Sequence, residues 1–220
     1  MSGLVQDFRY ALRSLRNHPG FTLIAALTLG LGIGGNAAIF SLINGVLLRP
    51  PRGVHEPQRL VNIYTSDFSS GDFGGSSYPD YETIRTEAGA FERVAGYDLR
   101  LLSVSAGDES SMLPGAVVTS DYFALLGLVP AAGRLLQPDD MTPGGALVAV
   151  ISHGLWANRF GSDPAAVGRT LRINGRTVTI VGVAPPDFSG LLRPIPNDVW
   201  LPVTADPILE PGSDNLTSMG

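Results

Sequence analysis

Residues 21–48 form a run of twenty-eight positions without a single Asp, Glu, Lys or Arg. A helix of this length reaches about 42 Å at about 1.5 Å per residue, whereas the hydrocarbon core of a bilayer is about 30 Å thick. Half of the run is Leu, Ile, Val or Phe, and each of these favours insertion by roughly 0.3–0.6 kcal/mol at a helix centre. The polar residues oppose insertion without reversing that sum: Thr22, Thr28, Asn36, Ser41 and Asn44. The pattern predicts one transmembrane helix over 21–48.

Three other interpretations of this run fit less well. A cleaved signal peptide has an apolar core of about 7–15 residues and a small-residue cleavage site, whereas this run is about twice as long and is followed by Arg49-Pro50-Pro51. Residues 30–35 match G-x-G-x-x-G, and Glu56 lies where a dinucleotide fold places its ribose-binding acid. That motif, however, sits inside a run too long for a strand. A buried helix of a soluble protein would show a polar face, which is not visible here.

Small residues recur every four positions along the apolar run, at Ala26, Gly30, Gly34 and Ala38. Positions four apart share one face of a helix, and a stripe of small side chains allows two helix backbones to approach closely in lipid. Gly and Ala are also common in membrane spans for no special reason, so both interpretations stay open. Asn36 and Asn44 point elsewhere, and we expect them to face protein or water rather than lipid tails.

A short basic amphipathic helix is predicted before the span, within residues 1–20. Leu4, Phe8, Leu12 and Leu15 repeat at helical spacing on one side, and Arg9, Arg13 and Arg16 occupy the other. Such a helix is suited to an anionic membrane surface, and residues 18–20 (His-Pro-Gly) form the elbow before the span. Three arginines precede the span and three follow it closely (Arg49, Arg52 and Arg59), so the positive-inside rule gives no orientation.

The rest of the chain reads as a proline-rich linker, 49–58, and an α+β domain, 59–220, with two subdomains expected. Strands are predicted at 59–65, 100–105, 111–118, 146–151 and 198–203, and a hairpin at 170–183 around Asn174-Gly175. Helices are predicted at 78–87, at 153–160 with Ser152 as its cap, and in a short segment ending at Leu126 with Thr119 or Ser120 as its cap. Residues 67–77 read as a Gly/Ser-rich loop, and residues 127–136 as a turn-rich crossover.

Composition excludes several chemistries. The chain has no cysteine and its 15 basic residues are all arginine, so it has neither a thiolate site nor the lysine of a P-loop. Its net charge of −5 argues against nucleic-acid binding. The three histidines lie far apart, at 18, 55 and 153, and the pair Asp139-Asp140 is expected to face water. Trp156 and Trp200 are expected to anchor the core or its edge. We predict no catalytic site, no metal and no cofactor.

Several ordered blocks resemble the MacB/FtsX-like ABC transporter permeases, in particular their large duplicated orphan permease group. The first block is 7–50, DFRYALRSLRNHPGFTLIAALTLGLGIGGNAAIFSLINGVLLRP. The blocks SYPDYETIR (77–85), SDYFALLGLVPAAGRLL (120–136) and 148–190 resemble the MacB-like periplasmic core domain of that family. The resemblance covers nearly the whole chain.

The resemblance implies an N-terminus on the cytoplasmic face of a bacterial inner membrane and a periplasmic domain. It further implies a non-catalytic permease component whose partners are the bilayer, a separate ATPase, and further spans or a second permease copy. Family members carry three more spans after the outer domain, so we expect a fragment here. A single-pass, membrane-anchored binding module is the alternative; a membrane-anchored enzyme is disfavoured by the lack of a catalytic constellation.

Overall fold

The computed structural model describes residues 2–44, 51–67, 71–106, 109–192, 195–209, 211–212 and 216. It comprises two compact units, Met1–Arg49 and Pro50–Gly220. The end of the predicted span (45–48), the start of the linker (49–50) and a glycosylation-like sequon at 215–217 fall wholly or partly outside the described residues.

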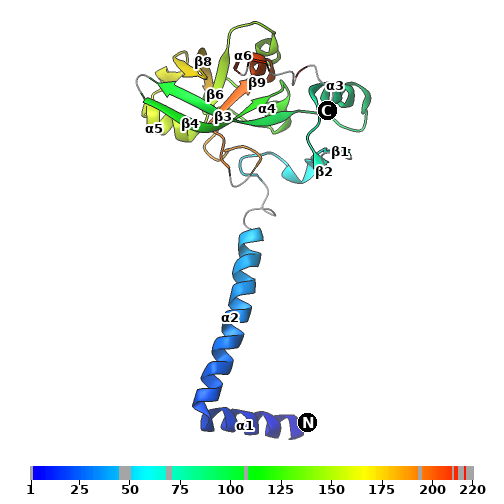
Figure 1. Ribbon diagram of the computed structural model, residues 1–220, viewed down its shortest axis with the longest axis vertical. Helices are drawn as coiled ribbons and strands as arrows, with labels where there is room; N and C mark the ends of the chain where they lie inside the picture. Colours follow the sequence, from blue (N-terminus) through cyan, green and yellow to red (C-terminus); the bar gives the residue numbers. More distant parts are fainter. Residues whose placement is uncertain are drawn as a thin grey trace. The chain divides into compact units, whose positions relative to one another are not determined.

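The first unit consists of two helices, α1 (Ser2–Asn17) and α2 (Pro19–Ile43). They meet at His18, whose backbone (φ −125°, ψ 67°) is not helical, and Pro19 then starts α2 at a position where its missing N–H costs nothing. The Thr22 hydroxyl lies within hydrogen-bond distance of the Leu15 carbonyl (2.8 Å) and of the His18 carbonyl (3.0 Å), which fixes the sharp bend between the helices (Figure 1). The N-terminal apolar helix is therefore confirmed.

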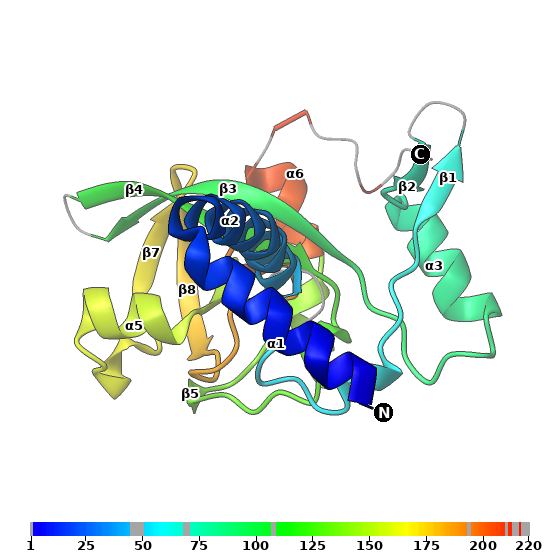
Figure 2. The same ribbon diagram turned by 90° about the horizontal axis from the view of Figure 1, so that it is seen from below.

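The second unit is built on a sheet of seven strands in the order β5-β8-β6-β9-β4-β3-β7. Their bounds are β3 Tyr97–Ala106, β4 Glu109–Val118, β5 Ala132–Gly133, β6 Val148–Ile151, β7 Thr170–Ile173, β8 Arg176–Val183 and β9 Val199–Pro202. The strand β8 also pairs with β7, so six strands close into a ring and β5 adds to the free edge of β8. In Figure 2, β7 and β8 run across the direction of β3 and β4. The expected α+β class is confirmed.

The central strands are buried on both faces, which explains why their sequences are continuous apolar runs rather than alternating ones. One cluster fills the inside of the ring, including Val117, Ala149, Ile151, Val199 and Leu201. The other covers the outside, where Ala116, Val118, Val148, Val150 and Trp200 meet Tyr122 and Phe123 of helix α4 (Tyr122–Leu125) and Phe188 of the loop after β8. Trp200 is fully buried and stacks on Phe188, with ring centroids 5.4 Å apart, so the expected core role of this tryptophan is confirmed.

Local signals account for several elements. The hairpin β7–β8 turns at Asn174 (φ 47°) and Gly175 (φ 79°), the positive values that a type I′ turn requires. Helix α3 (Tyr78–Glu87) starts with a capping box between Ser77 and Asp80, and helix α5 (His153–Phe160) starts with the Ser152 hydroxyl accepting from the Leu155 amide (2.9 Å). These three predictions are confirmed.

Three local predictions are wrong. Residues 60–64 are not a strand: a short 3₁₀ turn (Pro57–Arg59) precedes them, and β1 begins only at Thr65. The Gly/Ser-rich stretch contains the paired strands β1 (Thr65–Asp67) and β2 (Gly71–Gly74) instead of being only a loop. The N-cap residue of helix α4 is Asp121 rather than Thr119 or Ser120, and its side chain makes no cap hydrogen bond; the Thr119 hydroxyl accepts from the Gly96 amide instead (2.9 Å).

The two expected subdomains form one compact unit. In Figure 2 the small sheet β1–β2 and helix α3 lie to one side of the strand ring. Thr119, at the end of β4, joins them to it: its amide donates to the Gly96 carbonyl (3.0 Å), its hydroxyl accepts from Gly96, and Gly96 lies against the ring of Tyr81 on α3. Helix α6 (Asp206–Leu209), preceded by a 3₁₀ turn (Val203–Ala205), packs against the inner core.

Candidate functional site

Helix α2 has the length and composition of a membrane span. Among the described residues, α2 is long enough and apolar enough over residues 19–41 to cross a bilayer. None of its apolar window is buried inside the structure. The Thr28 hydroxyl donates to the Ile24 carbonyl (2.8 Å), as Thr22 does at the start of the helix, so both hydroxyls are satisfied without water. These two threonines therefore oppose insertion less than the sequence alone suggests.

The small-residue stripe lies on this helix, with Ala26, Gly30, Gly34 and Ala38 all exposed. A Cβ atom added at Gly30 or Gly34 would meet nothing within 4 Å, so α2 itself imposes no need for glycine at either position. The G-x-G-x-x-G glycines continue the helix and none has a positive φ, which differs from the phosphate-binding loop of a dinucleotide fold.

The other predicted residues of this unit are exposed as well. Asn36 lies within α2, and Asn44 follows its last residue with helical backbone angles. Arg9, Arg13 and Arg16 are exposed on α1, and Arg16 stands in its last turn, where a cation favours the helix dipole. The asparagines of the α2 segment and the arginines of α1 are neighbours only in sequence. Their roles stay predictions.

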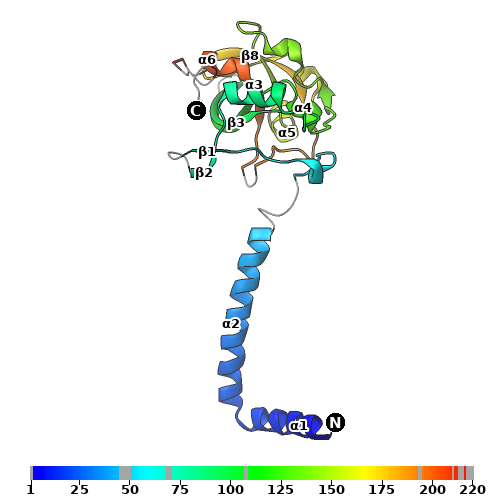
Figure 3. The same cartoon turned by 90° about the vertical axis from the view of Figure 1, so that its right-hand side faces the viewer.

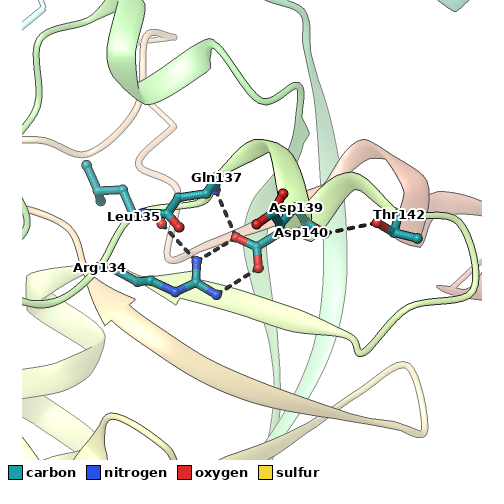
Figure 4. A network of polar contacts seen from close by, with 6 residues as sticks. All are labelled: Arg134, Leu135, Gln137, Asp139, Asp140 and Thr142. Atoms are coloured by element: carbon teal, nitrogen blue, oxygen red, sulfur yellow. Dashed lines mark hydrogen bonds and ion pairs between the residues drawn. The ribbon is translucent and has the colours of Figure 1, made fainter.

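In the second unit, Arg134 and Asp140 form a clamp that the sequence did not predict (Figure 4). The two guanidinium Nη atoms contact the two carboxylate oxygens at 2.6 and 2.8 Å, and the Gln137 amide donates to the same carboxylate at 2.8 Å. The Asp140 side chain is 8% exposed, so the expectation that both neighbouring aspartates face water is wrong for Asp140. Hydrogen bonding from Arg134 holds the pKa of Asp140 below its ordinary value. The clamp closes the turn after β5 and engages both carboxylate oxygens of Asp140.

A second polar cluster borders a cavity of about 250 Å³ beside β3. Arg100 of β3 donates from Nε to Asp206 of α6 (3.0 Å) and also pairs with Asp98, and the Asp206 side chain is 3% exposed. Apolar side chains and the hairpin asparagine complete the lining: Leu101, Leu102, Val117, Asn174 and Leu209. Arg100 and Asp206 are 106 positions apart, so no local signal could have joined them.

The remaining candidates stay separate. His153 begins α5 with its ring 5.4 Å from that of Trp156, whose Nε1 donates to the Asp163 carbonyl (2.8 Å). Ser152 is occupied as a helix cap and by Asp198, to which its hydroxyl lies at 2.7 Å. Among the residues that the structure describes, no group of three His, Asp or Glu side chains is placed to hold a metal.

These features define a class: an apolar helix fit for a membrane span, joined to an α+β domain built on a closed strand ring. The family profile of the MacB-like periplasmic core domain matches residues 22–217, and the chain belongs to that family.

Solved structures share the fold. The periplasmic region of MacB from Actinobacillus actinomycetemcomitans is 18% identical, with 74% of this chain and 67% of that chain covered and a TM-score of 0.52. The extracellular domain of the noncanonical ABC-type transporter YknZ from Gram-positive bacteria is 15% identical, with 60% and 65% covered and a TM-score of 0.50. The chain thus spans about two thirds of the length of these solved domains. No curated protein matches the sequence.

Proposed function

We propose that the chain is a non-catalytic part of an ABC transporter permease that couples a separate ATPase to an extracytoplasmic domain. The permease would be of the efflux or mechanotransmission type. One observation carries this proposal: a MacB-like periplasmic core domain follows an uncharged helix that is long enough to span a bilayer. ATP hydrolysis belongs to a partner because the chain contains no lysine and hence no P-loop.

The proposal includes an orientation, which the family's periplasmic description supports. With the domain outside the inner membrane, one span would leave α1 and its arginines, Arg9, Arg13 and Arg16, on the cytoplasmic face. There they would meet anionic lipid headgroups and could abut the ATPase. The absence of cysteine allows a direct test.

Single cysteines report this topology. We choose Ser14→Cys on α1 and Thr83→Cys on α3, which are both exposed. A membrane-impermeant maleimide added to intact spheroplasts should label Thr83→Cys at once and Ser14→Cys only after permeabilisation. The reverse pattern would show inverted insertion, and labelling of both variants in intact spheroplasts would rule out the span.

The second element of the proposal is that the stripe on α2 packs against further permease spans or a second permease copy. The packed membrane helices would then have two states, and nucleotide bound to the ATPase would favour one of them. The shift between these states would transmit the motion of the ATPase to the outer domain. The matched variants are Gly30→Leu, on the stripe, and Gly32→Leu, which points to the opposite face of the same helix. A Cβ atom added at either position meets nothing within 4 Å.

Association in the membrane separates these variants. Crosslinking of the intact complex should weaken about tenfold for Gly30→Leu, a loss of about 1.4 kcal/mol, and stay unchanged for Gly32→Leu. Equal crosslinking for both variants would remove the stripe from the proposal. Asn36 lies four residues after Gly32, on the face opposite the stripe, so Asn36→Leu should leave crosslinking unchanged as well; reduced crosslinking in both Gly32→Leu and Asn36→Leu would place the protein contact on that face instead.

The alternative function is a single-pass binding module without transport activity. The cavity beside Arg100 and Asp206 favours it, because a charged pair next to apolar side chains is a typical lining of small-molecule sites. A chain that binds its ligand undiminished in the Gly30→Leu variant, and that crosslinks to no other membrane protein, would support this alternative over the permease.

A further inference from the structure

The strand ring is incomplete at one corner, beside β3. Strand β7 pairs with β3 only at Val104 and Ser105. At Ser103 the turn residue Asn174 takes over the pairing: its amide donates to the Ser103 carbonyl, and its side-chain Oδ1 accepts from the Ser103 amide, both at 2.9 Å. Among the described residues, no strand pairs with this side of β3 over 97–102. This stretch of β3 is therefore a free sheet edge.

The backbone of Leu101 faces this edge. Leu101 lies opposite Pro114 of β4, which has no N–H, and the Pro114 carbonyl accepts from the Asp198 amide instead (2.7 Å). Leu101 therefore exchanges no hydrogen bonds with its opposite residue, and in an antiparallel pair such a residue points its N–H and C=O away from the partner strand. Ser103, two positions along, does the same toward Asn174. Leu101 thus presents one donor and one acceptor in the arrangement that an added strand uses.

The cavity of about 250 Å³ lies between this stretch of β3 and helix α6, which Figures 2 and 3 show close together. Its polar side chains already form hydrogen bonds: Arg100 donates to Asp206 (3.0 Å), and Asn174 donates from Nδ2 to a carbonyl of α6 (3.3 Å). The rest of the lining is apolar and comes from Leu101, Leu102, Val117 and Leu209. An apolar cavity of about 150 Å³ already admits a molecule as large as benzene, so this one has room for a leucine or phenylalanine side chain.

We propose that this corner binds an extended peptide segment, which adds to β3 as a further strand and places one large apolar side chain in the cavity. We call the free edge at Leu101 and the cavity together the β3-edge site. An extended peptide fits both features, because its backbone supplies an acceptor and a donor for Leu101 and its side chains supply the apolar group. A free fatty chain would fill the cavity and leave the strand edge unused.

The β3-edge site lies wholly within the second unit. The inference therefore goes beyond the permease function, does not depend on the insertion of α2, and holds equally for a binding module.

Blocked pentapeptides serve as probes of the full chain in lipid nanodiscs. Their sequence is fluorescein-Thr-Val-X-Val-Thr-amide, in which X is leucine, phenylalanine or aspartate. Fluorescence anisotropy measures their dissociation constants, with empty nanodiscs as the baseline for partition into lipid. The leucine and phenylalanine peptides should bind at least about tenfold more tightly than the aspartate peptide, because burial of a large apolar side chain favours binding and burial of a carboxylate opposes it.

N-methylated peptides test the backbone pairing. Opposite residues of paired strands share a face, so the peptide residue opposite Leu101 lies on its exposed face, and the neighbouring residue X points to the side of the buried Leu102. The N–H of X then points away from β3, whereas those of the flanking valines point toward it. N-methylation of both valines should weaken the leucine peptide about fivefold to tenfold. N-methylation of X should leave its affinity unchanged.

A proline substitution tests the protein side of the pairing. Leu101→Pro removes the outward N–H, at an edge position where a sheet tolerates proline, and should weaken the leucine peptide about fivefold to tenfold. Met112→Pro is the matched control: Met112 is 58% exposed on β4 and lies opposite Ser103, so its N–H also points away from the partner strand. Its affinity for the peptide should stay unchanged. Fluorescence of the buried Trp200 checks that both variants fold; if Leu101→Pro does not, the N-methylated peptides decide.

Two kinds of result would overturn the proposal. Equal affinities for the three peptides, or no saturable binding up to about 1 mM, would remove the β3-edge site. Preference for an apolar X that neither N-methylated valines nor Leu101→Pro weakens would overturn strand addition in favour of a pocket for apolar small molecules. In both cases the permease proposal would stand, because its tests concern α1, α2 and the membrane.

Discussion

Gly182 of β8 is the position where a single methyl group should do the most damage. An ideal Cβ there would lie 2.0 Å from the carbonyl oxygen of Arg134 and 2.8 Å from its carbonyl carbon and amide nitrogen. Its φ is not in the left-handed region, so alanine suits the backbone and the cost is steric. Ordinary contact begins near 3.4 Å, so the Arg134 backbone must move by well over an ångström.

The Arg134 backbone is poorly placed to move. Its amide donates to the Val181 carbonyl (2.9 Å), and its side chain is held by the Asp140 clamp. Forced overpacking costs about 1–3 kcal/mol and a lost hydrogen bond about 1 kcal/mol more, so we expect Gly182→Ala to destabilise the domain by about 3 kcal/mol. At about 2–4 °C per kcal/mol for a domain of this size, the melting temperature should fall by about 10 °C.

Thermal unfolding of the detergent-solubilised full chain, followed by tryptophan fluorescence, measures this loss because Trp200 is fully buried. Gly154→Ala is the matched control: it lies in helix α5, and its nearest neighbour would be the Ser152 hydroxyl at 3.7 Å. Alanine there should stabilise by up to about 1 kcal/mol. If Gly182→Ala has the same melting temperature as Gly154→Ala or as the wild type, close packing between β5 and β8 does not stabilise this edge of the sheet.

Substitutions at three further positions test other parts of the fold by urea unfolding. Asp140→Asn should cost about 2 kcal/mol at neutral pH. The pKa of Asp140 is lowered in the folded state, so its contribution to the free energy of unfolding is present above the ordinary carboxyl pKa and is lost as the pH falls through the folded value. The difference in unfolding free energy between variant and wild type should therefore shrink below about pH 4. A difference that does not change with pH would contradict the clamp. Ser152→Ala removes the acceptor of the Leu155 amide and should cost about 1–2 kcal/mol; an unchanged midpoint would show that water replaces the cap. Asn174→Ala strains the type I′ turn and removes the bond from the Ser103 amide (2.9 Å), whereas Asn174→Gly should restore the turn alone; equal losses would mean that turn strain is negligible.

Resemblance to the family was sufficient to predict its membership, because ordered sequence blocks run through nearly the whole chain. The roles within the candidate site are a different matter. The small-residue stripe and the α1 arginines act, in our proposal, on lipid and on other chains, so their positions in one chain leave those roles as predictions. The Arg134–Asp140 clamp was missed because adjacent aspartates in a turn carry no sign of which one will be covered.

Where short-range physics decides, the sequence alone determined the structure. An uncharged run long enough for a bilayer, Asn174-Gly175 between two β-rich runs, and Ser152 before α5 each satisfy their backbone within a few residues. Tertiary structure decided what needs a distant partner. Residues 60–64 alternate like a strand yet pair with none, and Arg100 finds Asp206 only because the ring brings β3 beside α6. A strand needs the hydrogen bonds of a neighbouring strand, and a buried charge needs a counter-ion. Neither partner can be read from the residues that are adjacent in the sequence.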